Sequence, residues 1–383
     1  MDLLEKLKSY SVERFIQLFF LGANVCDIKE KNFDSFLAWA MLGKRLSAAS
    51  DEELSKIIFV KNEFCKRHNL KFEPGYNHNV GHLDMTLKET IPYLHRPLLL
   101  YVSSGTMELF GNCIFYIVGF QRLELNGVKY WYRHGPPCSS VKPLLFFHGI
   151  CTGWFAYFGV VSALGRERAV VLVDLDAIKI KSMQFEMPTS EKYCEIVYKI
   201  LQRHNISKVS LAAHSFGTIT AGWFVRAYPS AVDHLTLIDP VSLLLALPDV
   251  AYAFLHRPPS TLIEWIIFLG ASRELTISHT LHRNFWWYRN ILWLEDVPHS
   301  IPVVVGLAQN DEIANTKAVA EYVELCREGR RKAARSSSVS TEDSSSLYTR
   351  TAAHAEIHSV HWAGFSHGQV LLTTKACAAL AGT

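Results

Sequence analysis

The chain has 383 residues, of which 49% are hydrophobic and 20% are charged, and its formal net charge is +3 with the histidines neutral. This length accommodates one large domain with insertions or two smaller domains, at about 100 to 200 residues per domain. The composition is that of a globular protein with a large core. A net charge so close to zero argues against a nucleic-acid partner, because nucleic acids are bound by strongly basic faces.

The eight cysteines include no C-x-x-C pair, which argues against a zinc site or a redox dithiol and favours buried free thiols. The N-terminus lacks a basic segment followed by an apolar core and a cleavage site, so secretion is not indicated. We therefore expect a reducing, intracellular location, either cytoplasmic or peripherally membrane-associated.

Residues 1–119 predict a helical N-terminal extension. Apolar residues recur at helical spacing from Leu3 to about Leu46, and another helix is expected to begin at Asp51. Such helices are expected to pack on the following domain or to associate with a membrane.

The segment Pro97 to Phe120 is long enough to cross a bilayer, at about 20 residues per span. Glu108, Asn112 and three glycines interrupt it, and these residues are costly in a lipid-facing helix. The favoured prediction is a pair of buried helices, with a peripheral or embedded membrane helix as the alternative.

Residues 120–383 predict an α/β domain. Two β-rich runs flank Asn126-Gly127, a dipeptide that favours a two-residue hairpin turn. Short apolar runs then alternate with helical segments, which indicates a doubly wound, mainly parallel sheet with helices on both faces. The runs are 144–147, 169–173, 209–213, 235–238, 303–307 and 357–362.

Two intervals break this alternation. Residues 240–300 are helical and rich in leucine and aromatic residues, and predict a cap insertion. Residues 327–350 are dense in serine and arginine and low in apolar residues, and predict a disordered surface loop.

The segment Ala213-His214-Ser215-Phe216-Gly217 passes from a β-rich run directly into a helix. This pattern is typical of a nucleophile elbow, in which small residues flank a serine held in a strained, exposed turn. Ala213 replaces the first glycine of G-x-S-x-G and is still small. Ser215 is therefore the predicted nucleophile.

A second strand end, at His148-Gly149-Ile150, precedes the first crossover helix. An oxyanion hole needs two backbone N–H groups aimed at the developing negative charge. The predicted donors are the N–H groups of Ile150 and Phe216.

The acid and the base are expected after later strands. Asp311 follows the run at 303–307, with Glu312 beside it, and Asp239 is the competing acid at the end of an earlier run. His367 lies in a glycine-flanked loop after the final strand and is the predicted base. His358 and His361 are expected to pack or to face solvent.

These residues, in the order Ser215, Asp311, His367, resemble the α/β-hydrolase superfamily, and the resemblance covers roughly residues 120–383. It implies an α/β-hydrolase fold and a serine hydrolase that needs no metal and no organic cofactor. Segments beginning at His95, Leu237 and Phe285 also resemble a poorly characterised eukaryotic group with a helical N-terminal extension.

The expected reaction is cleavage of a carboxylic or lipid ester, a small-molecule substrate, through an acyl-enzyme. An acyltransferase or an amide hydrolase uses the same triad, and a non-catalytic binding protein on the same scaffold is a further alternative. The cap aromatics Phe285, Trp286, Trp287, Tyr288 and Trp293 either line an acyl pocket or pack in the core. The oligomeric state is left open.

Overall fold

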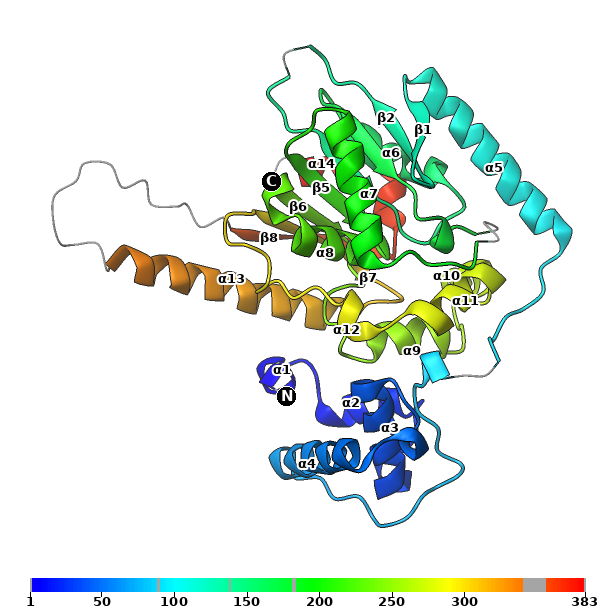
Figure 1. The fold of residues 1–383 in the computed structure, drawn as a ribbon, viewed down its shortest axis with the longest axis vertical. Coiled ribbons are helices and arrows are strands. Elements are labelled where there is room, and N and C mark those ends of the chain that lie inside the picture. Colours follow the sequence, from blue (N-terminus) through cyan, green and yellow to red (C-terminus); the bar gives the residue numbers. More distant parts are fainter. Residues whose placement is uncertain (1, 88–89, 138, 181–183, 340–355, 382–383) are drawn as a thin grey trace. The chain divides into compact units, whose positions relative to one another are not determined.

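The computed structural model describes residues 2–87, 90–137, 139–180, 184–339 and 356–381. The chain forms two compact units (Figure 1). One comprises Met1–Leu94 with Ala246–Trp286, and the other comprises His95–Leu245 with Trp287–Thr383.

The second unit is built on an eight-stranded sheet in the order β1-β2-β4-β3-β5-β6-β7-β8. The first two strands pair antiparallel with each other and β2 pairs antiparallel with β4, and all later pairs are parallel. The predicted fold class and every predicted strand are confirmed. The strands are β1 (Gln121–Leu125), β2 (Val128–Arg133), β3 (Leu144–Phe147), β4 (Val170–Val173), β5 (Val209–His214), β6 (Val232–Ile238), β7 (Val303–Asn310) and β8 (Ile357–Ser366).

The predicted turn between β1 and β2 is present, with positive φ at both Asn126 (+49°) and Gly127 (+82°). Strands β3 and β4 are buried at every position, as expected for strands covered on both faces. Helix α6 packs against α14, and α7 packs against α8, as Figure 1 shows. These helices are α6 (Phe158–Leu164), α7 (Ser190–Arg203), α8 (Gly217–Ala227) and α14 (Thr374–Ala381).

The first unit joins the N-terminal helices to the insertion. The Tyr10 hydroxyl donates a hydrogen bond to the buried Asp249 carboxylate, which also pairs with Arg14 at 2.8 Å. The ring of Trp286 lies against Gly43, where a Cβ would come within 2.5 Å of it. The helices are α1 (Asp2–Lys6), α2 (Val12–Phe19), α3 (Glu30–Leu42), α4 (Asp51–Arg67), α9 (Asp249–Leu255), α10 (Leu262–Ile267) and α11 (Leu275–Asn284).

This division differs from the predicted boundary between residues 119 and 120. Helix α5 (Leu98–Ile117) belongs to the second unit, where the Phe115 ring contacts the rings of Phe120 and Trp131. The predicted cap instead shares a unit with the N-terminal helices. Hydrophobic periodicity identifies a helix but does not identify the surface on which it packs.

The prediction of a buried helix pair at 97–120 is wrong. The segment forms one 20-residue helix, α5, and it is the single described helix long and apolar enough to cross a membrane. Only 17% of the most apolar 18-residue stretch of α5 is buried within the protein. Its apolar side chains are therefore not accounted for by core packing.

The prediction of a disordered loop over 327–350 is wrong for its first half. Helix α13 extends over Thr316–Val339, and the rest of the predicted loop lies outside the described residues. The Arg330 guanidinium is buried and donates to the backbone oxygens of Val297 and Ile301, each at 3.0 Å. The prediction rested on amino-acid composition, which counts every arginine as solvent-exposed. It therefore could not identify an arginine that is buried with hydrogen bonds to backbone carbonyls.

Candidate active site

Ser215 occupies the sharp turn between β5 and α8, with a φ of +51°. Its N–H donates to the oxygen of Ile238 at 3.0 Å, which ties the turn to the end of β6. Gly217 starts the helix where a Cβ would lie 2.3 Å from the backbone oxygen of Phe147. Any larger residue at position 217 would therefore collide with the backbone at the end of β3.

The three predicted triad residues come together at the ends of three strands. The Nε2 atom of His367 lies 2.8 Å from the Oγ of Ser215, and its Nδ1 atom lies 2.7 Å from the Oδ2 of Asp311. Ser215 follows β5, Asp311 follows β7 and His367 follows β8. Parallel strands end at one edge of the sheet, and this places residues 152 positions apart in contact.

Asp311 is held so that one oxygen faces the imidazole ring. Its other oxygen, Oδ1, accepts hydrogen bonds from the N–H groups of Ile313 and Ala314 at 2.7 and 2.8 Å. Burial works to lower the pKa of His367, but the Asp311 carboxylate outweighs it and raises that pKa to about 9. The ring is therefore strongly basic and oriented toward the serine.

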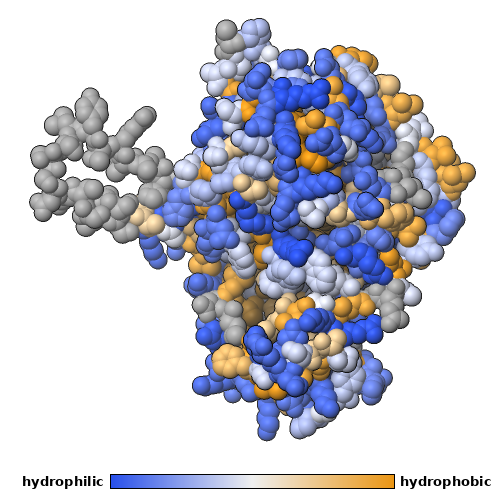
Figure 2. Space-filling view, in the orientation of Figure 1, coloured by the Kyte–Doolittle hydropathy of each residue, from blue (hydrophilic) through white to orange (hydrophobic). Residues whose placement is uncertain are grey.

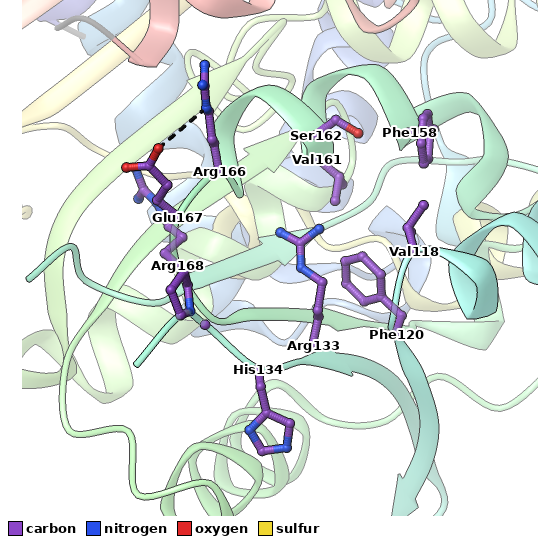
Figure 3. A pocket seen from close by; sticks show the side chains of 12 residues that line it. Val118, Phe120, Arg133, His134, Phe158, Val161, Ser162, Arg166, Glu167 and Arg168 are labelled. Carbon is purple, nitrogen blue, oxygen red and sulfur yellow. Dashed lines mark ion pairs between the residues drawn. The ribbon is translucent and has the colours of Figure 1, made fainter. Parts of the chain in front are cut away.

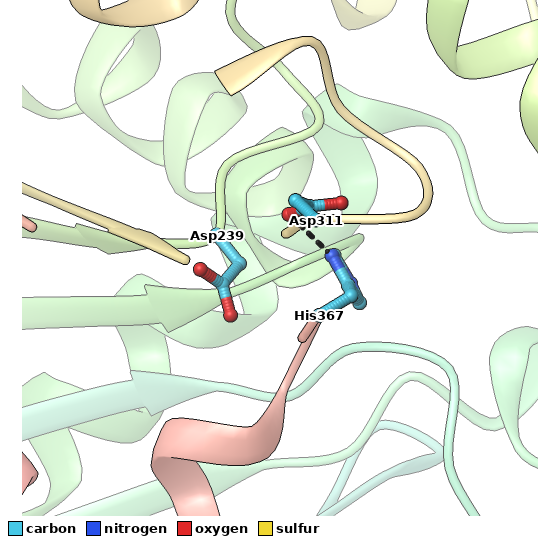
Figure 4. A group of neighbouring side chains, drawn as sticks. All are labelled: Asp239, Asp311 and His367. Carbon is cyan, nitrogen blue, oxygen red and sulfur yellow. Dashed lines mark hydrogen bonds and ion pairs between the residues drawn. The ribbon is translucent and has the colours of Figure 1, made fainter. Parts of the chain in front are cut away.

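Two further carboxylates hold the backbone of the histidine loop. Glu312 accepts a hydrogen bond from the His367 N–H at 2.9 Å, and Asp239 accepts one from the Gly368 N–H at 2.8 Å. Asp239 also accepts from the Ala308 N–H at 2.9 Å, and burial raises its pKa to about 6. Figure 4 shows the ring of His367 paired with Asp311, whereas Asp239 accepts its hydrogen bonds from the main chain.

Asp239, Asp311 and His367 offer ligand atoms within 4.8 Å of one another, a spacing at which a cation could be shared. Each carboxylate, however, already accepts two backbone N–H groups. The Nδ1 atom of His367 is engaged by Asp311. These hydrogen bonds explain the positions of all three groups, so we assign the cluster to orienting the histidine.

The strand end after β3 has its own set of hydrogen bonds. His148 is buried; its Nδ1 donates to the Gly149 oxygen at 2.7 Å, and its Nε2 accepts from the Leu175 N–H at 3.0 Å. A Cβ at Gly149 would lie 2.8 Å from the Cβ of Ser215, so the backbone there passes directly beside the serine. His148 and Gly149 therefore shape the turn that leads into Ile150.

Tyr157 is a residue that the sequence did not single out. Its hydroxyl accepts from the Gly149 N–H at 2.7 Å and lies 3.0 Å from Nδ1 of His214, within hydrogen-bond distance. The Nε2 atom of His214 in turn lies 3.9 Å from the Oδ2 of Asp239. These hydrogen bonds connect the end of β3 to His214, and nothing in the spacing of Tyr157 in the sequence signals this.

His214 is the variable residue of the elbow and is fully enclosed. Burial lowers its pKa well below the usual range, with a further contribution from His367, so the imidazole is neutral. Its Nδ1 atom lies 3.0 Å from the Tyr157 hydroxyl, and its buried Nε2 atom has no hydrogen-bond partner among the described residues. His358 and His361, by contrast, are exposed on β8.

The aromatic residues that the sequence assigned to the cap belong to both units, Trp286 to the first and Trp293 to the second. Trp286 packs against Gly43 in the first unit, and the Trp293 ring lies 6.3 Å from that of Tyr322 on α13 in the second. Both contacts are packing contacts. They support the core interpretation of these two tryptophans over the acyl-pocket interpretation.

Residues 142–293 match the family model of the alpha/beta hydrolase fold. This chain has the α/β-hydrolase fold. A curated relative, the abhydrolase domain-containing protein abhd-5.2 of Caenorhabditis elegans, is 24% identical over 155 residues, which are 39% of this chain and 34% of that protein. The match thus spans about a third of the relative's length.

Solved structures of α/β hydrolases align with the domain at low identity. Carboxylesterase CesB of Bacillus subtilis is 12% identical, with 74% of this chain and 95% of that chain covered and a TM-score of 0.45. A membrane phospholipase A described as a bacterial virulence factor is 14% identical, with 74% and 94% covered and a TM-score of 0.44. These likenesses concern the fold alone.

Proposed function

We propose that the α/β-hydrolase domain is a serine hydrolase that cleaves carboxylic or lipid esters. The observation that carries this proposal is the continuous hydrogen-bonded chain from Asp311 through His367 to Ser215, with distances of 2.7 and 2.8 Å. Such a chain activates a hydroxyl that is otherwise a weak nucleophile. The strained elbow that holds Ser215 adds independent support.

In the proposed reaction Ser215 attacks the ester carbonyl while His367 Nε2 takes the hydroxyl proton. The tetrahedral oxyanion accepts hydrogen bonds from the N–H groups of Ile150 and Phe216. Collapse of this intermediate breaks the bond to the alkoxide, which leaves with the proton held by His367. Water then attacks the acyl-serine, again giving its proton to His367, and the acid is released with Ser215 restored.

The hydrogen bonds support Ile150 over its neighbour Gly149 as one proposed oxyanion donor. The Gly149 N–H is already engaged by the Tyr157 hydroxyl at 2.7 Å. The next peptide N–H along the chain is that of Ile150, and the backbone there passes beside Ser215. Phe216 supplies the other donor from the N-cap position of α8.

Labelling with a fluorophosphonate probe tests the proposal. We expect the folded wild-type chain to take up one phosphonyl group on the peptide that contains Ser215, measured by mass spectrometry. Ser215→Ala should not label, because the nucleophile is absent, and His367→Ala should label far more slowly. A folded wild-type protein that does not react with the probe would contradict the hydrolase proposal and favour a binding role.

The pH dependence of kcat/KM is a second expected result. His367 must be neutral to accept a proton, and its pKa in the fold is raised to about 9. Activity is therefore expected to rise with pH, with a midpoint near that value. Asp239 contributes to raising the pKa of His367, so Asp239→Asn should move the midpoint to lower pH.

Initial rates with a soluble short-chain ester across pH 6 to 10 measure both midpoints. The exposed Glu356 on the same unit provides the control, and Glu356→Gln should leave the midpoint unchanged. A midpoint that stays fixed in Asp239→Asn would show that this carboxylate does not act on the imidazole.

A further inference from the structure

Helix α5 turns its charged residue toward the protein and its apolar residues toward solvent, which is the reverse of an ordinary surface helix. Its inward face, at helical spacing, carries Ser104, Glu108, Gly111 and Phe115. A Cβ at Gly111 would lie 2.8 Å from that of Phe155, so this face packs closely on the second unit. The single charged residue of the helix, Glu108, thus lies on the inner face, and its carboxylate comes within 3.7 Å of the Lys179 ammonium.

The outward face of α5 is mainly apolar, with Ser103 and Thr106 as exposed polar residues. Leu98 and Leu99 are 76% exposed, Leu109 is 64% exposed and Ile117 is 82% exposed. Apolar colour gathers at the edge of the molecule where Figure 1 shows α5 (Figure 2). Surface helices normally turn their polar face to water, so this face is built for an apolar environment. The exposed apolar residues of this face, here called the α5 face, are Leu98, Leu99, Val102, Met107, Leu109, Phe110, Tyr116 and Ile117.

A basic pocket begins where the helix ends. Val118, the C-cap residue of α5, lines a cavity of about 530 Å³ together with Phe120 and three arginines. Figure 3 shows Arg133 between the apolar side chains on one side and Arg168 and Glu167 on the other. Three guanidinium groups against one carboxylate leave the pocket with an excess of positive charge. The arginines are Arg133, Arg166 and Arg168.

The arginines are only partly committed to other groups. Arg133 donates to the Gly165 oxygen at 2.7 Å, and Arg166 contacts the exposed Glu167 at 3.7 Å. The buried Nε atom of Arg168 has no hydrogen-bond partner among the described residues. The pocket therefore offers donors to an anion at the end of the apolar face.

We propose that α5 and the arginine pocket together bind the second unit to the surface of a membrane that contains anionic lipids. The α5 face would lie in the interface, and the pocket would take a lipid headgroup phosphate or carboxylate. Charge complementarity selects this occupant, because another copy of the chain would have to bring an anionic patch beside an apolar one. The inner face is covered by protein, so α5 lies in the interface and does not span the bilayer.

Flotation of the full chain with lipid vesicles tests this proposal independently of catalysis. Wild-type protein is expected to float with vesicles of phosphatidylcholine containing 30% phosphatidylserine, and less with phosphatidylcholine alone. Leu99→Glu with Leu109→Glu should weaken binding to both by at least about tenfold, because charged groups resist burial in the interface. The matched control is Phe59→Glu, at a 67% exposed position on α4, which should bind like wild type.

The arginines are tested separately. Arg166→Gln with Arg168→Gln should lose about fivefold in affinity per arginine for the anionic vesicles and leave binding to neutral vesicles unchanged. Arg203→Gln, on the exposed surface of α7, is the control and should keep the anionic preference.

Three results would overturn the proposal. The first is wild-type protein that floats with neither vesicle, and the second is a Phe59→Glu variant as weak as the α5 variant. The third is a wild-type dimer in sedimentation velocity that becomes a monomer in the α5 variant, since a second copy then covers the face. Equal thermal unfolding midpoints for all variants confirm that each result concerns binding and not folding.

Discussion

Replacing Asp311 by asparagine is expected to lower kcat for ester hydrolysis by about 10⁴-fold while the protein stays folded. The carboxylate accepts the Nδ1 proton of His367 and leaves Nε2 free to take the proton of Ser215. An asparagine amide at this place donates to Nδ1, so the ring proton moves to Nε2 and the base is lost. Steady-state kinetics with a p-nitrophenyl ester measures the effect.

Asp239→Asn is the matched control, because it makes the same chemical change at a buried carboxylate of the same site. Asp239 accepts the N–H groups of Ala308 and Gly368 and does not touch the imidazole. Its loss should therefore cost at least about 100-fold less in kcat than the loss of Asp311. The reverse order of the two variants would identify Asp239 as the acid.

Gly217→Ala is expected to prevent stable folding of the α/β-hydrolase domain. The added Cβ would lie 2.3 Å from the Phe147 oxygen and 2.7 Å from the His148 oxygen, and both are backbone atoms at the end of a central strand. Relief requires moving β3 or α8, so the free energy of unfolding should fall by more than about 3 kcal/mol. Chemical denaturation followed by tryptophan fluorescence measures this loss.

Gly329→Ala provides the comparison within the same unit. Gly329 lies inside α13, and a Cβ there meets nothing within 4 Å. Alanine favours the helix over glycine by about 1 kcal/mol, so this variant should be as stable as wild type or slightly more stable. If Gly217→Ala unfolds at the wild-type denaturant concentration, the elbow is looser than its geometry indicates.

The sheet, and the meeting of the three candidate site residues at one edge of it, were predictable because both follow from local patterns. Each strand is a short apolar run, and Ser215, Asp311 and His367 each come directly after one. Parallel strands end at the same edge, so chain order alone brought these residues together. The sequence favours Asp311 as the acid with Asp239 as the competitor, and in the structure Asp311 is hydrogen-bonded to the His367 ring while Asp239 is bonded to the Gly368 N–H.

Other features depend on contacts between distant segments, which a single sequence does not reveal. Tyr157 connects to His214 across 57 residues, and the inward turn of Glu108 depends on Lys179. Arg330 belongs to a stretch of polar composition but is buried against loop carbonyls. In each case a polar group pairs with a partner far along the chain, while sequence patterns report only on neighbours.

The first unit is formed by two segments far apart in the sequence, Met1–Leu94 and Ala246–Trp286, so it cannot be completed until most of the chain has been synthesised. The buried partner of Tyr10 is Asp249, which is 239 residues downstream. At about 5 to 20 residues per second, a ribosome needs roughly 12 to 48 s to add them. The N-terminal helices therefore leave the ribosome well before this partner exists, and during that interval their apolar surface is available to chaperones.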